Sequence, residues 1–588
     1  MTAETESSVI DGEPRLTSHT EVRKLRIASC VALIAIETAR AWFTRYELTP
    51  DSMSYLDIAR GIAEGHFGDA ISSYWSPGYP VLVSLFLWLF RPNAYWEFPL
   101  VHFVNLLIFV GTLGSFQIFW NEALRWHRRY TKDRSGEIPE FAFWAIGYAV
   151  FGIAIANIIT VGLVAPDLLV SGFCLLAGSA TLRFRRTPSL GSAIWLGFVL
   201  ALGYYAKAPF LPMGIVFLLC VCLSRPLSSR IIVLAATAAA TFLLICSPLV
   251  VALSRANGRL TFGDSARLNQ AFYINGVQYF RHWQGGPPGS GSPIHPTRKL
   301  NDFPQIYEFA ADDMGTYPPW YAPTYWNAGI HPHLDLRRQV AVFTRNMALE
   351  FQIIMESGAE LVCVAIILAL LTGYRWKWAK AICHLWFIWA PGAFALLMFA
   401  LVHVEPRFLG GWLVILFGGI MCATMLPEGD GVRRAVWCIG MAAIMTAGAG
   451  VLLEASREAV GIDHAVGRSS EDASIAIALL QSGLHPGDHV ALIGDGTGAY
   501  WAHLARLRII AEIPASSASR PGTPAIDFWE SAPDNQQKAL EILEQTGAKV
   551  VIAGANPSIV DAVPTTIPSP WKRVDGTRAY IYAFPMKR

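Results

Sequence analysis

The sequence predicts a polytopic α-helical membrane protein with a soluble α/β domain at its C-terminal end. Of its 588 residues, 53% are hydrophobic and only 15% are charged, whereas about 25% of a soluble domain is charged. Apolar stretches of the length that crosses a bilayer recur from residue 26 to residue 454. From residue 455 onward, short apolar strands alternate with helices, which is typical of an α/β domain.

Each membrane-spanning helix needs about 20 apolar residues, and eleven segments are candidates. These are 26–46, 99–121, 140–162, 168–183, 189–206, 209–223, 230–253, 351–373, 380–402, 408–426 and 434–454. The apolar segment 77–91 is shorter than the others. It is either a twelfth span or a helix that lies at the membrane surface.

The basic loops decide between these two alternatives, because Lys and Arg concentrate on the cytoplasmic side. Loops 121–139, 183–188, 224–230, 374–380 and 427–434 are basic. They all face the cytoplasm together with the N-terminus only if 77–91 does not cross. We therefore predict a juxtamembrane or re-entrant helix at 77–91. The chain is expected in the inner (cytoplasmic) membrane, with a cytoplasmic N-terminus and an extracytoplasmic C-terminal domain.

This topology divides the chain into five parts. They are a cytoplasmic tail (1–25), a transmembrane core (26–253) with its first outer loop at 47–76, an aromatic-rich outer loop (254–350), further transmembrane helices (351–454) and the outer α/β domain (455–588). The net charge is only +2, so nothing indicates a nucleic-acid partner. All nine cysteines fall in apolar segments, where they are expected as small buried side chains.

Isolated charged residues gather on the predicted outer face. Asp51 follows the first span, Asp167 precedes a later one, and Lys207, Glu405 and Arg407 lie in short outer turns. Each has a structural explanation: an aspartate at a helix start acts as a cap, a lysine snorkels to the interface, and Arg407 pairs with Glu405. Their common face favours a functional site instead. There Asp51 is a catalytic carboxylate, and Lys207 and Arg407 hold a phosphate.

Other motifs carry less weight. Asp57 and Glu64 are interpreted as solvated residues of a helix face. The His331–His333 pair near Asp335 is weak evidence for a metal site. The stretch GDGTGAYW, with Gly494, Gly496 and Gly498, departs from the dinucleotide-binding pattern, and we interpret it as a tight turn between a strand and a helix.

Five motifs resemble the GT-C superfamily of membrane glycosyltransferases. They are TPDSMSYLDIARGIAEG, YWSPGYPVLVSLFLWLF, APDLLVSGF, LGYYAKAPF and EPRFL. The nearest branch contains the protein O-mannosyltransferases and the aminoarabinose-to-lipid A transferases. In that family the first outer loop carries the catalytic carboxylate, often as Asp-Glu. Asp51 matches this carboxylate, but Ser52 replaces the second acid, which puts a metal site on that pair in doubt. The aminoarabinose branch has a Lys before its juxtamembrane helix, where this chain has Ser76-Pro77.

The resemblance implies inverting transfer of a sugar from a polyprenyl-phosphate donor to a lipid, glycan or protein acceptor outside the cytoplasm. Asp51 and Asp167 are the implied catalytic residues, and Lys207 and Arg407 the donor-phosphate ligands. Tyr55, Trp75, Tyr79 and Glu405 are expected to line the substrate. No metal ligand is assigned, and a divalent metal stays open as a cofactor.

Three other functions stay open at this stage. A flippase or transporter of lipid-linked glycans would carry charges at mid-membrane depth. An inactive GT-C-like assembly protein would keep the fold without the chemistry. A polymerase or ligase of lipid-linked glycans would carry several arginines in its outer loop, and this loop has them.

Overall fold

The computed structural model describes residues 19–131, 136–223, 228–277, 282, 294–295, 297–309, 315–372, 375–460, 470–514, 528–554 and 569–584. Residues 1–18 of the expected cytoplasmic tail lie outside the described residues. So does most of 278–296 within the expected aromatic loop.

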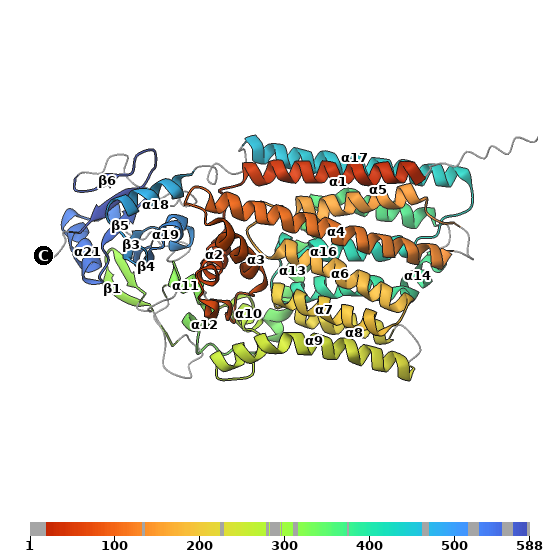
Figure 1. Cartoon of the computed structure of the whole chain (residues 1–588), viewed down its shortest axis with the longest axis horizontal. Helices are drawn as coiled ribbons and strands as arrows, with labels where there is room; N and C mark the ends of the chain where they lie inside the picture. The colour runs from red at the N-terminus through yellow and green to blue at the C-terminus, as the bar shows by residue number, and fades with distance from the viewer. Residues whose placement is uncertain are drawn as a thin grey trace, which may run out of the picture.

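Long helices lying side by side make up most of the chain (Figure 1). Each of the eleven segments predicted to span the membrane overlaps one or two helices, and the polytopic helical fold class is confirmed. The helices are α1 (His19–Phe43), α4 (Glu97–Thr131), α5 (Glu140–Phe151) with the π-helix η2 (Gly152–Asn157), α6 (Asp167–Arg186), α7 (Leu190–Ala206), α8 (Phe210–Leu223), α9 (Ser229–Ala256), α13 (Leu336–Leu371), α14 (Arg375–His384), α15 (Trp386–Val402), α16 (Pro406–Ala423) and α17 (Asp430–Val460).

Seven of the helices that the structure describes are long and apolar enough to cross a bilayer. The number is eight when the bent pair Trp378–His384 and Trp386–Val402 counts as one span. Helices α7 and α8 are apolar but shorter, and α13 breaks at Gly358. The predicted positions of the helices agree with the structure, and the predicted number of eleven spans stays a prediction.

Short elements cover one end of this bundle, between the long helices and the sheet (Figure 1). They are α2 (Pro50–Ala63), η1 (Phe67–Ala70), α3 (Gly78–Phe90), α10 (Ser265–Asn269), the π-helix η3 (Gln270–Ile274), α11 (Pro318–Tyr321) and α12 (Pro323–Trp326). Helix α3 is the predicted juxtamembrane segment. Its 13 residues rise only about 20 Å, which is less than the roughly 30 Å of a bilayer core.

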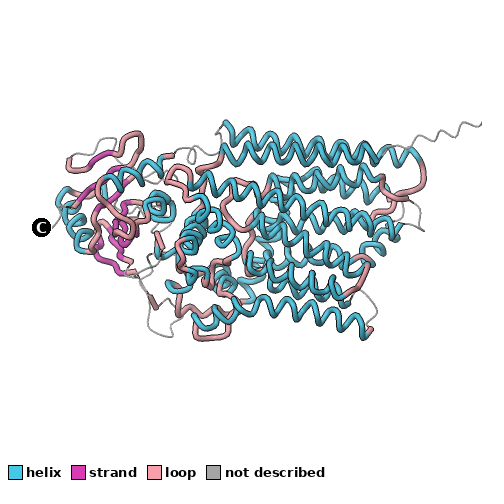
Figure 2. The backbone as a smooth tube through the Cα atoms, in the orientation of Figure 1, coloured by secondary structure: helices cyan, strands magenta, loops and turns pink. Residues whose placement is uncertain are grey.

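All strands lie at that same end of the molecule (Figure 2). They form one seven-stranded sheet in the order β1-β2-β4-β3-β5-β7-β6. The strands are β1 (Arg298–Asp302), β2 (Gln305–Glu308), β3 (His489–Ile493), β4 (Arg508–Ile513), β5 (Val550–Ala553), β6 (Lys572–Arg573) and β7 (Tyr580–Ala583). Strand β3 pairs in parallel with β4 and β5. Around the sheet lie α18 (Glu471–Gln481), η4 (Gly496–Gly498), α19 (Tyr500–Ala505), η5 (Phe528–Glu530) and α21 (Pro533–Gln545).

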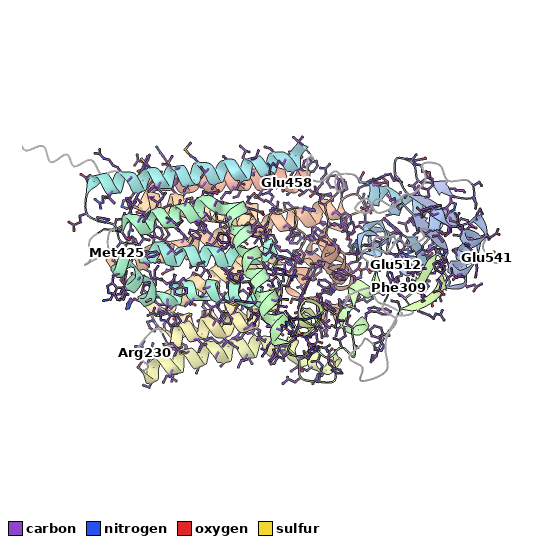
Figure 3. All side chains as sticks on the ribbon, turned by 180° about the vertical axis from the view of Figure 1, so that it is seen from behind. Arg230, Phe309, Met425, Glu458, Glu512 and Glu541 are labelled. Carbon is purple, nitrogen blue, oxygen red and sulfur yellow. The ribbon has the colours of Figure 1, made fainter. Side chains whose placement is uncertain are left out.

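The sequence pattern suggests that the C-terminal segment alone forms the sheet. In the structure, strands from another part of the chain join it. Strands β1 and β2 come from the segment 254–350, and β2 pairs antiparallel with β4. The amide of Phe309 extends this pairing by donating to the carbonyl of Ile510, 2.7 Å away. Phe309 and Glu512 accordingly lie next to each other in Figure 3. These two strands and the C-terminal segment are thus parts of one folded unit.

The glycine-rich stretch is a tight turn between β3 and α19. Asp495 accepts hydrogen bonds from the amide of Thr497 at 2.9 Å and from its hydroxyl at 2.8 Å. A Cβ atom at Gly496 would clash with the ring of Tyr317, so the close approach of these two segments requires glycine there.

Candidate active site

Helix α2 positions Asp51 at its first turn. The hydroxyl of Ser52 accepts a hydrogen bond from the amide of Thr49 at 2.9 Å and donates to the carbonyl of Val164 at 3.1 Å. Ser52 therefore fixes the start of the helix and ties it to the turn before α6. The Asp51 carboxylate points instead to a guanidinium on another helix.

Five charged residues from four parts of the chain form one continuous chain of ion pairs. Lys207 Nζ lies 2.7 Å from Asp167 Oδ1, and Arg407 Nη1 lies 3.9 Å from Asp167 Oδ2. Arg407 Nη2 lies 2.7 Å from Asp51 Oδ2, and Arg407 Nε lies 2.5 Å from Glu405 Oε2. The sequence predicted these five residues, and the structure brings all of them together.

The charge balance of this cluster is slightly negative, because two cations face three carboxylates. The side chain of Asp167 is only 3% exposed. Its Oδ2 atom has no hydrogen-bond partner among the described residues. Lys207 Nζ also lies 4.3 Å from the centre of the Phe408 ring, a distance that suits a cation–π contact. The cluster is therefore buried around Asp167 and retains one acceptor atom without a hydrogen bond in the described structure.

His403 and Tyr273 extend the cluster, and sequence reasoning missed both. His403 Nε2 lies 3.0 Å from Glu405 Oε1. The rings of His403 and Tyr273 stack with centres 3.9 Å apart. Burial alone would raise the pKa of Glu405, but the hydrogen bond from His403 and the charge of Arg407 lower it to about 2. The only signal in the sequence is the position of His403 two residues before Glu405.

The predicted aromatic lining lies beneath the charged cluster. Tyr55 is buried. Its ring meets the rings of Trp75 and Tyr79 edge-on, with ring centres 5.1 Å and 5.7 Å apart respectively. Burial and the carboxylates of Asp51 and Asp167 raise the pKa of Tyr55 well above its ordinary value. Trp75 donates to the carbonyl of Tyr321 at 3.1 Å, and Tyr79 donates to Asn105 at 2.8 Å. Of the four residues predicted to line the substrate, Tyr55, Trp75, Tyr79 and Glu405, none lines either of the two cavities described next.

Those two cavities differ greatly in size. The charged cluster surrounds a space of about 10 Å³ that Asp167, Lys207, Phe210, Arg407 and Trp412 help to line. A second, mostly apolar cavity of about 1250 Å³ lies between α2, η1, α3, α6, α7 and α9. Phe67, Leu85, Trp88, Phe173 and Leu249 are among its lining residues.

The large cavity does not contain the ion pairs, but it approaches them along two turns of the chain. Leu169 and Tyr205 line it, two residues from Asp167 and Lys207 respectively. Pro77 and Gly78 line it as well, and the preceding Ser76 accepts a hydrogen bond from the amide of Ala208 at 3.1 Å. The ion-paired residues are therefore the groups that could bind or react with a polar substrate. The apolar cavity adds space for a hydrophobic group beside them.

One of the two predicted surface residues, Asp57, is not solvated, so the interpretation was wrong for it. Asp57 accepts hydrogen bonds from the amide and the hydroxyl of Thr316, both at 2.8 Å, and its side chain is 9% exposed. The cause is the sheet domain, which covers this face of α2. Glu64 is exposed, as predicted, and its Oε1 atom lies 3.0 Å from Arg506 Nη1.

The HPH segment does not behave as a metal site. His331 and His333 are exposed, and Asp335 caps α13 by accepting from the amide of Arg338 at 3.0 Å. No three His, Cys, Asp or Glu side chains converge as metal ligands in the described part of the chain. The carboxylates of the charged cluster are bonded to Lys207 and Arg407.

No protein-family model matches the chain, and no curated protein matches it in sequence. Solved structures do match. ArnT from Cupriavidus metallidurans bound to undecaprenyl phosphate superposes with a TM-score of 0.51 at 12% identity, over 96% of this chain and 98% of that one. Its apo structure gives 0.50 at 13% identity over the same shares. The oligosaccharyltransferase of Archaeoglobus fulgidus gives 0.49 at 12% identity, over 90% of this chain and 67% of that one.

The chain thus has the fold of ArnT over nearly its full length, which agrees with the predicted class of a polytopic helical protein with a C-terminal α/β domain. At this level of identity the likeness is one of fold. Substrate and chemistry have to be argued from the residues of the site.

Proposed function

We propose that this protein is an integral-membrane glycosyltransferase that moves a sugar from a polyprenyl-phosphate donor to an acceptor hydroxyl, with inversion. The observation that supports this most strongly is the ion-pair chain from Lys207 through Asp167 and Arg407 to Asp51. It sets a carboxylate and two phosphate-binding cations at one end of a membrane bundle. The fold shared with ArnT, whose structure holds undecaprenyl phosphate, supports the same assignment.

Lys207 and Arg407 are the proposed ligands of the donor phosphate. A guanidinium binds phosphate with two parallel N–H donors, and an ammonium adds a point charge. When the bond between the sugar C1 and the phosphate oxygen breaks, negative charge grows on the phosphate. Fixed cations at this position stabilise the transition state more than the ground state.

Asp51 is the proposed general base. The acceptor hydroxyl attacks C1 from the face opposite the phosphate, its proton passes to Asp51, and the polyprenyl phosphate leaves with the bonding electrons. In this structure Arg407 donates to Asp51 at 2.7 Å. A phosphate that takes over this guanidinium would release the carboxylate, so binding of the donor activates the base. The unused Oδ2 of Asp167 is placed to accept a hydroxyl of the sugar.

The large apolar cavity fits the lipid part of such a donor. A polyprenyl chain is hydrocarbon, and a cavity of about 1250 Å³ lined by residues such as Leu85, Trp88 and Leu249 would hold a segment of it. Because the cavity reaches the end of α7, where Lys207 lies, one molecule could reach both the cavity and this cation. A flippase has no comparable need for a carboxylate held beside phosphate ligands at one end of the bundle.

Two measurements on the purified chain test the proposal. The first is binding of undecaprenyl phosphate in detergent micelles, for which we expect saturable affinity. The second is release of polyprenyl phosphate from a panel of synthetic polyprenyl-phosphate sugars, incubated with membranes that supply the acceptors. This product is common to every donor sugar, so the assay does not require the acceptor to be known.

A matched pair of variants sharpens both measurements. Lys207→Gln removes a proposed phosphate ligand. The control, Lys299→Gln, removes a lysine of the sheet domain whose ion-pair partner in the described structure is Asp302 on β1. We expect loss of binding in the first variant alone. Equal binding by both variants and the parent chain would refute the assigned phosphate site.

A further inference from the structure

His503 connects the sheet domain to the helical part of the molecule. It lies on α19, and its side chain is 2% exposed. Its Nδ1 atom lies 2.5 Å from Asp57 Oδ1 on α2, and its Nε2 atom lies 2.7 Å from Glu97 Oε1 on α4. The ring also lies parallel to that of Phe98, with centres 6.4 Å apart. One buried imidazole therefore joins three elements that are remote in the sequence.

The partners of His503 are held by further bonds. Asp57 also accepts from the amide and hydroxyl of Thr316, and Glu97 is ion-paired with Arg60. A buried polar group that loses its partner bears its full desolvation cost. Undocking the sheet domain would leave Asp57 and Glu97 without His503, so this contact resists separation of the two parts.

Helix α2 carries both this contact and the proposed base. Asp51 lies in its first turn and Asp57 follows six residues later, which places them about 9 Å apart along the helix axis. At one end of α2 the Asp51 carboxylate meets Arg407 of α16. Further along, Asp57 meets the imidazole of the sheet domain. The position of the base relative to the phosphate ligands therefore depends on both attachments.

We propose that His503 is a positioning residue for the transfer reaction, acting through Asp57 to hold α2 and thus Asp51 in the reactive arrangement. This inference rests on the proposed function. It assigns to the C-terminal domain a direct role in turnover, separate from any choice of acceptor. A positioning defect of this kind lowers the rate of the chemical step and leaves binding of the donor lipid intact, because Lys207 and Arg407 lie on other elements.

The test compares His503→Ala, Asp57→Ala and Asp57→Asn in the full-length chain. An asparagine at position 57 can accept from the Thr316 amide with its carbonyl oxygen and donate to His503 Nδ1 with its amide group. Asp57→Asn should therefore restore the bridge that Asp57→Ala breaks. We expect His503→Ala and Asp57→Ala to lose about tenfold to a hundredfold in kcat, as small misplacements do. KM and undecaprenyl phosphate affinity should stay within about twofold, and Asp57→Asn should remain close to the parent chain.

Hydrogen–deuterium exchange of the α2 amides supplies a readout that needs no substrate. Exchange should be faster in both alanine variants and unchanged in Asp57→Asn. His485→Ala is the matched control, since His485 is exposed on the same domain and its recorded partner is Asp488. Asp57→Ala leaves the sheet domain unaltered, so the test stands even if His503→Ala unfolds that domain.

Parent-like turnover and α2 exchange in both alanine variants would overturn the positioning role. So would an Asp57→Asn variant as impaired as Asp57→Ala. If the parent chain fails to bind undecaprenyl phosphate, the proposed function falls instead. The exchange of α2 then decides by itself whether His503 holds this helix.

Discussion

Arg407 Nη2 lies 2.7 Å from Asp51 Oδ2, which joins the first turn of α2 to the first turn of α16 across 356 positions of the sequence. The same guanidinium bonds Glu405 through Nε and faces Asp167 through Nη1. The proposed phosphate ligand and the proposed base thus neutralise each other, and a donor phosphate that binds Arg407 has to separate them.

Replacing Asp51 with asparagine should abolish turnover without weakening donor binding. The amide keeps the shape of the carboxylate but cannot accept the proton, and general bases contribute about 10²–10⁴-fold in rate. Because Arg407 loses a competing carboxylate, affinity for undecaprenyl phosphate should stay equal or rise. Steady-state release of polyprenyl phosphate and equilibrium binding measure the two effects separately.

Asp302→Asn is the control for this prediction, because Asp302 is an exposed carboxylate on β1. It should resemble the parent chain in both assays. If Asp51→Asn turns over normally, the general-base role is wrong and an assembly or binding function for the fold gains support.

Arg407→Lys should bind undecaprenyl phosphate more weakly than the parent chain. A lysine has no planar fork, so it cannot hold phosphate with two parallel bonds or keep contact with Asp51, Glu405 and Asp167 at once. Charge-assisted hydrogen bonds contribute about 1.5–3 kcal/mol, so the loss should be about tenfold to a hundredfold in affinity. Arg230→Lys is the control, since Arg230 lies at the opposite end of the bundle (Figure 3). Equal affinities in the two variants would contradict the assignment.

Filling the apolar cavity should discriminate between lipids by chain length. Ala252 lines the cavity from α9, and Ala252→Phe places a ring in the space assigned to the polyprenyl chain. Undecaprenyl phosphate should then bind more weakly, whereas geranyl phosphate, whose chain is much shorter, should be affected far less. Val233→Phe on the same helix, at a position that is 62% exposed, controls for the added aromatic ring. A uniform effect on both lipids would argue that the chain lies elsewhere.

The charged cluster could be predicted from the sequence because its members share a simple property. Asp51, Asp167, Lys207 and Arg407 each stand at the end of an apolar segment, and the alternation of spans with basic loops puts those ends on one face. Sidedness alone brings such residues near each other. It does not say which carboxylate bonds which cation, and the central place of Arg407 emerged only from the structure.

The sheet domain's contacts could not be predicted in the same way. His503 and Asp57 are separated by 446 positions. Nothing in the sequences of α19, which carries His503, and of α2, which carries Asp57, indicates that these side chains meet. Strands β1 and β2 are five and four residues long and contain polar side chains, so they lack the periodicity that reveals a strand. Their place in the sheet comes from the pairing of β2 with β4, which is a long-range contact, and β1 pairs with β2.

Asp472 should make the stability of the sheet domain depend on pH. Burial raises its pKa from 3.8 to about 7, with Glu471 adding to the rise, although the amide of Trp501 donates to it at 3.1 Å. The folded state then holds a proton more tightly than the unfolded state, so the free energy of unfolding falls as pH rises from about 4 to about 7, by at most about 1.4 kcal/mol per pH unit. Asp472→Asn keeps the acceptor for Trp501 and removes the titration. In thermal unfolding followed by tryptophan fluorescence, the variant should gain on the parent chain as pH increases. Asp534→Asn on α21, at an exposed position, controls for the loss of one negative charge. If the stability gained by Asp472→Asn does not vary with pH, burial of this carboxyl is not its cause.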